Sequence, residues 1–312
     1  MIEIVKYNSC MQAQWDEAVK ASRNGTFMHH RAFMEYHSDR FTDYSLLAMD
    51  KSKVLAVLPA NRVGDKVYSH QGLTYGSWLV TPKCDAVTMM QVMDETVKFL
   101  KNDGVVELIY KPVPHIYHRY PAEEDLYALF RHGAALTECS ISTTIDLDEP
   151  IKFDRGNRSA VNRALRAGIE ISESDDYEGY WQVLQGVLQS RYDTRPVHTI
   201  EEMRLLQSRF PDNIKLYTAT MHGEIVAGVV MFYAGPVAHS QYIAAASAGR
   251  ENGALALLFD TLIKQSADEG YRYYDFGISC ENHGQYLNEG LAQQKARLGG
   301  RGIAYNVFSI KL

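Results

Sequence analysis

Small residues gather in one segment directly before a long helical pattern, and this combination suits the binding of an anion. The segment runs Ala246-Ser247-Ala248-Gly249-Arg250-Glu251-Asn252-Gly253-Ala254. Small side chains leave peptide N–H groups open to a ligand, and the start of a helix adds the positive end of its dipole. Arg250 would add a charge-assisted contact. The segment therefore predicts a diphosphate site; the plainer alternative is a glycine-rich surface loop.

A second cluster of potential ligand-binding residues is basic. Residues 155–166 contain four arginines and no acidic residue. On a helix, Arg155, Arg158 and Arg166 fall close to one side. Guanidinium groups in this arrangement suit a substrate phosphate or an RNA backbone. The alternative is a solvated helix face beside the acidic residues 173–178.

The sequence shows no competing arrangement of nucleophiles or metal ligands. The cysteines, at positions 10, 84, 139 and 280, are far apart and form no CxxC pair. We therefore predict no metal site, no Ser/His/Asp triad and no disulfide framework, and we expect a reducing compartment.

The elements that must position these residues follow an α/β order that occurs twice. In the first copy we expect strands at 45–49, 54–60 and 67–71, a helix at 86–101 and a strand at 105–110. In the second copy we expect strands at 214–221, 225–233 and 237–244, a helix at 254–268 and a strand at 271–277. Equivalent positions lie at a nearly constant offset: His70 and His239 are 169 apart, and Gly104 and Gly270 are 166 apart. This repetition predicts a duplicated unit.

Further signals predict where the copies begin and end. Pro150 follows an expected strand at 141–147, which places a boundary between a domain of residues 1–149 and a domain of residues 150–312. Ser9 with Gln12, and Thr199 with Glu202, have the spacing of capping boxes before helices. We also expect a helix at 31–39.

Composition limits the class of protein. The chain has 312 residues, of which 46% are hydrophobic and 22% charged, so we expect about two folded domains. A net charge of −6 gives no overall positive field for DNA or for an anionic membrane. The N-terminus lacks an apolar signal segment, and the most apolar stretch, 225–238, is shorter than the ~20 residues that span a bilayer. We expect a cytoplasmic protein with no membrane span.

The segment Arg250-x-x-Gly253-x-Leu255, between a strand and a helix, resembles the pyrophosphate loop of the GNAT superfamily of N-acyltransferases. The family pattern is Arg/Gln-x-x-Gly-x-Gly/Ala, from which Leu255 departs. The tandem layout narrows the resemblance to the FemABX-like branch, which includes peptidoglycan-bridge aminoacyltransferases and proteins that use acyl-CoA. Other pieces that fit this branch are Leu58-Pro59, residues 72–76, residues 158–168, His239-Ser240-Gln241-Tyr242 and Tyr274-Asp275-Phe276-Gly277.

The resemblance implies two tandem GNAT-like domains, each with a central mixed sheet flanked by helices. The second would bind acetyl-CoA or another acyl-CoA through Gly249, Arg250, Asn252, Gly253 and Ala254. It would pass the acyl group to an amine of a small molecule, a peptide or a cell-wall precursor. One alternative is aminoacyl transfer from charged tRNA. Another is a binding protein of the same fold without catalysis.

The resemblance also points to catalytic candidates, because the donor arm in GNAT folds lies between two splayed central strands. Here these strands are 237–244 and 271–277. Strand alternation puts His239 and Tyr242 on opposite faces, so both reach one substrate only if the strand has a bulge. We expect Glu281 or His239 to accept the amine proton and Tyr286 to protonate the leaving group.

Four further residues are predicted to contact the substrate. Tyr242 and Asp275 lie on the two central strands, and Arg191 and Arg195 lie in a polar segment before residue 199. Plainer roles compete with these predictions. A strand histidine can be an ordinary core residue, and Asp275, close before Gly277, can satisfy backbone N–H groups of a turn.

Overall fold

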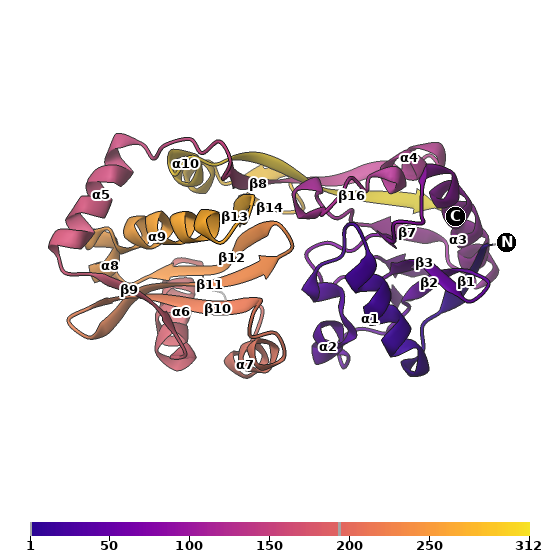
Figure 1. Cartoon of the computed structure of the whole chain (residues 1–312), viewed down its shortest axis with the longest axis horizontal. Coiled ribbons are helices and arrows are strands. Elements are labelled where there is room, and N and C mark those ends of the chain that lie inside the picture. The colour runs from indigo at the N-terminus through magenta and orange to yellow at the C-terminus, as the bar shows by residue number, and fades with distance from the viewer. Residues whose placement is uncertain (1, 193–194) are drawn as a thin grey trace. The chain divides into compact units, whose positions relative to one another are not determined.

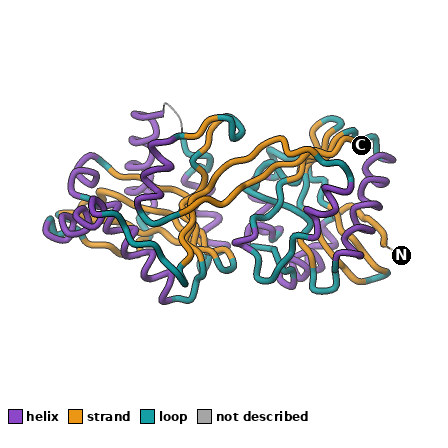
Figure 2. Tube along the Cα trace, turned by 90° about the horizontal axis from the view of Figure 1, so that it is seen from above, coloured by secondary structure: helices purple, strands orange, loops and turns teal. Residues whose placement is uncertain are grey.

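The computed structural model of the chain describes residues 2–192 and 195–312, with the backbone alone at residues 191 and 192 (Figure 1). It divides into two compact units. Unit 1 comprises residues 1–141, 280–286 and 304–312, and unit 2 comprises residues 142–279 and 287–303. Ile2 and Leu312, the first and last described residues, therefore both belong to unit 1 (Figure 2).

Unit 1 is built from short strands and four α-helices. Its strands are β1 (Ile2–Lys6), β2 (Leu46–Asp50), β3 (Lys53–Leu58), β4 (Asn61–Val63), β5 (Lys66–Tyr68), β6 (Leu79–Val80) and β7 (Glu107–Tyr110). Its helices are α1 (Gln12–Ala21), α2 (Arg31–Met34), α3 (Ala86–Asn102) and α4 (Glu124–Arg131). One sheet has the order β1-β2-β3-β6, and β5 pairs with β7 in parallel.

Four further strands complete the topology. The strands β8 (Ala135–Asp146) and β16 (Arg301–Lys311) each contribute residues to both units. β14 (Cys280–Glu281) and β15 (Tyr286–Leu287) form a two-stranded sheet.

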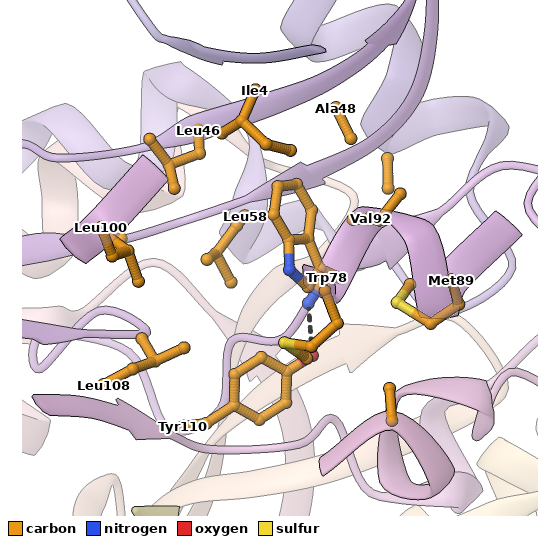
Figure 3. Close-up of a cluster of buried hydrophobic side chains, with 14 of the residues drawn as sticks. Ile4, Leu46, Ala48, Leu58, Trp78, Met89, Val92, Leu100, Leu108 and Tyr110 are labelled. Atoms are coloured by element: carbon orange, nitrogen blue, oxygen red, sulfur yellow. Dashed lines mark hydrogen bonds between the residues drawn. The ribbon is translucent and has the colours of Figure 1, made fainter. Parts of the chain in front are cut away.

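The core of unit 1 contains buried aliphatic side chains from β1–β3 and α3 around Trp78 (Figure 3). Tyr110 is a buried polar link in this core. Its hydroxyl accepts a hydrogen bond from the backbone N–H of Trp78 at 2.8 Å and donates one to a side-chain oxygen of Asp125 at 2.8 Å. Buried polar groups need such partners, because an unsatisfied one costs about 1–3 kcal/mol.

Asp125 should make the stability of unit 1 depend on pH. Burial raises the pKa of this carboxyl to about 7, although the hydrogen bond from Tyr110 acts to lower it. The folded chain then holds a proton on Asp125 that the unfolded chain releases near pH 4, so the contribution of Asp125 to stability is greatest below that pH and falls as pH rises toward 7. We expect a slope of at most about 1.4 kcal/mol per pH unit in this window, measured by urea unfolding. Asp125→Asn should flatten the slope, and an unchanged slope would contradict the assignment.

Unit 2 is a mixed sheet with helices on both faces. Its strands are β9 (Glu170–Ser174), β10 (Ile214–Met221), β11 (Glu224–Ala234), β12 (Val237–Ala245) and β13 (Tyr273–Ile278). Its helices are α5 (Arg155–Arg166), α6 (Tyr177–Tyr192), α7 (Ile200–Arg209), α8 (Ser247–Asn252), α9 (Ala254–Asp268) and α10 (Glu289–Arg297). The strand order is β13-β12-β11-β10-β9. Helix α9 covers one face, and α6 and α7 lie on the other (Figure 1).

The repeated order predicted from the sequence is present in the structure. In unit 1, β5 and β7 pair in parallel and α3 lies between them in sequence. In unit 2, β12 and β13 pair in parallel and α9 lies between them in sequence. The predicted domain division between residues 149 and 150 stays a prediction. In the structure, the chain first passes from unit 1 to unit 2 between residues 141 and 142.

Some local predictions were wrong. Ser9 does not cap α1: Asn8 caps a short 3-10 helix at Ser9–Met11, and α1 then begins without a side-chain cap. The helix expected at 31–39 is α2 followed by a 3-10 turn at Glu35–His37. The capping box of Thr199 and Glu202 is confirmed at the start of α7. No described helix combines the length and apolar character needed to cross a bilayer.

Candidate active site

The central strands of unit 2 pair over a short stretch only. Val237, Ala238 and His239 of β12 pair in parallel with Tyr273, Tyr274 and Asp275 of β13. Beyond His239, β12 continues along β11 as far as Ala245. The two strands thus part immediately after the His239–Asp275 pair, which leaves room for a ligand between their carboxyl ends.

A β-bulge in β12 brings His239 and Tyr242 onto one face. Ser240 lies opposite Met231, whereas Tyr242 lies opposite Val230, so Gln241 is the extra residue. His239 lies opposite Phe232, and Val230 and Phe232 share a face because strand side chains alternate. The sequence predicted opposite faces in a regular strand and named a bulge as the way to unite these residues. The bulge is present.

His239 and Asp275 form a hydrogen-bonded pair at the point where the strands part. The Nδ1 atom of His239 lies 2.8 Å from one Asp275 carboxylate oxygen. The other oxygen accepts hydrogen bonds from the hydroxyls of Ser142, at 2.5 Å, and Thr144, at 2.7 Å, both on β8. A carboxylate at Nδ1 places the ring proton there and leaves Nε2 as the basic atom.

The surroundings keep Asp275 ionised and hold it away from solvent. Its side chain is 0% exposed, whereas that of His239 is 14% exposed. Burial alone would raise the pKa of Asp275, but the hydrogen bond and charge of His239 and the two hydroxyls hold it below its ordinary value. Both oxygens of Asp275 are bound inside the protein, which places this carboxylate to orient His239; the predicted contact of Asp275 with substrate stays a prediction.

A cavity of about 160 Å³ is lined by residues of both separated strands. Ile243, Ala244 and Ala245 of β12 line it from one side, and Phe276 of β13 lines it from another. Leu255 and Phe259 of α9, Arg250 of α8 and residues of α6 and α10 complete the lining. The cavity is therefore mostly apolar, with Arg250 and Lys295 as its cationic members.

Lys295 is a functional candidate that the sequence did not reveal. It lies on α10 and is buried, and its ammonium donates hydrogen bonds to the carbonyl oxygens of Gly277 and Ile278, both at 2.8 Å. These carbonyls belong to the end of β13 that no longer pairs with β12. The positive charge thus lies where the strands diverge.

The predicted anion-binding loop is a short helix. Residues 247–252 form α8, and Gly253, with φ of 79°, separates it from α9. The Arg250 guanidinium donates to the Ala245 carbonyl at 2.7 Å and to the Ser247 hydroxyl at 2.9 Å, and the Asn252 amide donates to the Ala248 carbonyl at 2.9 Å. The prediction of an open loop was wrong, because the small residues form helical hydrogen bonds and allow close packing.

The two glycines of this segment are packing residues. A Cβ atom at Gly249 would lie 2.2 Å from the Val226 carbonyl oxygen of β11. A Cβ atom at Gly253 would lie 2.5 Å from the Ala160 carbonyl oxygen of α5. Ala254 is fully buried. The roles predicted for Gly249, Gly253 and Ala254 in cofactor binding therefore stay predictions, alongside this structural role.

Gly249→Ala should destabilise unit 2 by about 1–3 kcal/mol, because the added methyl group meets backbone that cannot rotate away. Gly186→Ala is the matched control, since Gly186 lies in α6 with nothing within 4 Å of the added Cβ. We expect the control to be neutral or slightly stabilising. Urea unfolding measures both changes, and equal effects at the two positions would contradict the packing argument.

Tyr242 is held in place on the same face as His239. Its hydroxyl lies 2.6 Å from Nδ1 of His198 and accepts a hydrogen bond from the His198 N–H at 3.2 Å. Its ring meets Trp181 of α6 edge to face, with centroids 5.4 Å apart. Burial raises the pKa of Tyr242, although hydrogen bonds from His198 and Gln241 act to lower it. The Tyr242 hydroxyl thus stays protonated, and its predicted contact with substrate stays a prediction.

The remaining predicted site residues lie elsewhere. Glu281 and Tyr286 belong to unit 1, in β14 and β15, and Tyr286 is 57% exposed. Arg195 is exposed before α7. The side chain of Arg191 lies outside the described residues. Within the described chain, no three His, Cys, Asp or Glu side chains gather as a metal site.

Comparison with known proteins agrees with this arrangement. Residues 152–286 match a family described as the acetyltransferase (GNAT) domain. No curated protein matches the chain. Among solved structures, FemX is similar with a TM-score of 0.70 at 14% identity, covering 99% of this chain and 97% of that one.

Two further solved structures extend the comparison over nearly the whole chain. The structure of L-PGS from Bacillus licheniformis is similar with a TM-score of 0.65 at 14% identity, covering 95% of this chain and 90% of that one. A tandem GNAT protein from the clavulanic acid biosynthesis pathway has a TM-score of 0.51 at 10% identity, covering 100% and 98%. Residues 152–286 thus match the acetyltransferase (GNAT) domain family, and the chain as a whole has the FemABX-like tandem GNAT fold.

Proposed function

We propose that unit 2 transfers an acyl group from an acyl-CoA thioester to an amine, with His239 as the general base. The observation that carries this proposal is the His239–Asp275 pair at the divergence of β12 and β13. GNAT folds hold the donor arm between these strands, and here the same place has an apolar cavity. The base and its orienting carboxylate lie where the two strands part, and later residues of the same strands, Ile243 and Phe276, line the cavity.

The chemistry requires a proton acceptor and stabilisation of the developing oxyanion. Nε2 of His239 would take a proton from the attacking amine as its nitrogen bonds to the thioester carbonyl carbon. The carbonyl oxygen gains negative charge, which backbone N–H groups of β12 beside the gap and the Lys295 ammonium are placed to stabilise. Collapse of the intermediate expels the CoA thiolate, which leaves as the thiol once it takes up a proton.

The donor tail would be recognised at the start of α8 and α9. Arg250 lines the cleft and is exposed, so its guanidinium can exchange its intramolecular hydrogen bonds for a diphosphate. Leu255, where the family pattern has Gly or Ala, lies in the cleft lining. A larger side chain here narrows the space beside the acyl arm.

Aminoacyl transfer from charged tRNA is the second candidate, favoured by the fold similarity to FemX and to L-PGS. The four arginines of α5 would suit an RNA backbone. Tight binding of charged tRNA that weakens steeply with added salt, with transfer to an amine, would favour this donor.

Titration calorimetry with acetyl-CoA and longer acyl-CoAs tests the donor, and mass spectrometry of amine mixtures tests for product. We expect saturable binding that Arg250→Glu weakens about tenfold or more. Arg166→Glu, the same charge reversal on the exposed side of α5, serves as the control and should leave the affinity within about twofold. No heat with any thioester would contradict the proposal, and binding without product would indicate a non-catalytic protein.

A further inference from the structure

Unit 2 has a second hollow that shares no residue with the donor cleft. It lies between α5, α9 and the segment 150–153, and its volume is about 500 Å³, against about 160 Å³ for the cleft cavity. We call it the α5–α9 groove. Ligand sites for small molecules commonly have volumes of ~300–1,000 Å³. The groove therefore has the size of a binding site without belonging to the proposed reaction.

The walls of the groove are held firmly. Asp154 follows the segment 150–153 and donates its N–H to the Arg297 carbonyl at 2.9 Å. Gly299, with φ of 92°, approaches the same segment so closely that a Cβ atom there would lie 2.1 Å from the Ile151 carbonyl oxygen. Arg158 of α5 donates a hydrogen bond to the Phe153 carbonyl. Three separate contacts thus fix the segment that closes one end of the groove.

The floor of the groove is apolar. Ile145, which is only 2% exposed, lies at its base. Phe153, Val161 of α5 and Ile263 of α9 form its sides. An apolar floor with a buried base suits the aliphatic chain of a ligand.

The rim of the groove carries an excess of positive charge. Lys152, Arg158 and Lys264 surround it, against one acidic residue, Asp260, which pairs with Lys264 at 2.7 Å. Within the described chain, no carboxylate forms an ion pair with Lys152 or Arg158. Two uncompensated cations beside an apolar hollow complement a ligand with an anionic head and an apolar body.

We propose that the α5–α9 groove binds a free single-chain amphiphile with a carboxylate head, its aliphatic part on Ile145, Val161 and Ile263 and its head between Lys152 and Arg158. This site is independent of acyl transfer and needs no donor or acceptor. Since α5 packs against the α8–α9 junction through Ala160 and Gly253, the ligand would contact a helix that also supports the donor cleft.

Octanoate is the probe. The comparison 1-octanol has the aliphatic chain without the charge, and acetate has the charge without the aliphatic chain. Titration followed by methyl NMR of isoleucine-labelled protein locates the binding. We expect octanoate to shift the Ile145 and Ile263 methyl signals in a saturable way, octanol to bind at least fivefold more weakly, and acetate to leave the signals unchanged.

Charge reversals on α5 and its preceding segment provide the matched test. The double variant Lys152→Glu/Arg158→Glu should weaken octanoate binding at least tenfold and leave octanol binding unchanged. Arg155→Glu/Arg163→Glu makes the same change in charge at exposed positions that do not line the groove, and it should change the affinity less than threefold.

Three results would overturn the proposal. One is the absence of saturable methyl shifts with octanoate. Another is equal weakening by the two double variants, which would indicate diffuse electrostatic attraction. A third is binding to phosphatidylglycerol vesicles without binding to octanoate monomers, which would indicate a membrane-facing helix.

Discussion

Replacing His239 by glutamine is expected to lower the rate of acyl transfer by about 10²–10⁴-fold, the usual contribution of a positioned general base. Glutamine keeps a hydrogen-bonding side chain toward Asp275 but cannot accept the amine proton. The affinity for acyl-CoA should change little, because the thioester is bound by the cleft. Steady-state kinetics with the amine found by mass spectrometry, together with calorimetry for acyl-CoA, measures the two effects separately.

The pH profile distinguishes a base from a packing residue. The loss of rate in acid that a general base produces in the parent, its acid limb, should be absent from His239→Gln. His115→Gln, at an exposed position in unit 1, is the control and should keep both the rate and the profile. An acid limb that survives in His239→Gln would show that another group is the base and would contradict the proposal.

Asp275→Ala is expected to destabilise unit 2 by about 3–5 kcal/mol, the largest stability effect that we predict. Removal of the carboxylate leaves His239, Ser142 and Thr144 without their shared acceptor in a buried site. Urea unfolding of the variant measures this loss. Asp268→Ala, at an exposed position at the end of α9, should change stability by less than about 0.5 kcal/mol.

The variant Asp275→Asn separates the role of Asp275 in orienting His239 from its role in stabilising unit 2. The amide fills the same space, so most of the stability should remain, while the rate falls because the amide no longer fixes the proton on Nδ1 of His239. The lowered pKa of Asp275 stabilises the fold above the ordinary carboxyl pKa, and this stabilisation disappears as pH falls through the folded value. The Asn variant should therefore be less sensitive to acid unfolding than the parent. A loss of less than about 1 kcal/mol in Asp275→Ala would contradict the buried network.

Much of the fold could be predicted from the sequence, because hydrophobic periodicity and turn residues act locally. The hairpin of β10 and β11, the helix α9 and the strands β12 and β13 follow from these patterns. The capping of α1 did not, since Ser9 and Asn8 are both good caps and the choice depends on how the chain enters the helix.

The site was harder to predict, since its geometry depends on contacts distant in sequence. His239 and Asp275 were both singled out, but their pairing depends on the register of β12 with β13. The bulge at Gln241 has no glycine or proline to mark it. Ser142 and Thr144 reach Asp275 from more than 100 positions away, and Lys295 lies in an ordinary polar helix. The sequence predicted an open loop at 247–252 because small residues are compatible both with peptide groups exposed to a ligand and with the close helix packing that the structure has.

A crystal structure of the protein with a non-hydrolysable acyl-CoA analogue tests the central claim most directly. We predict density for the acyl arm between β12 and β13, with its carbonyl carbon within reach of an amine hydrogen-bonded to Nε2 of His239, and the diphosphate contacted by Arg250. An analogue bound in another place, or an empty cleft at saturating concentration, would contradict the assignment of unit 2 as a CoA-dependent acyltransferase.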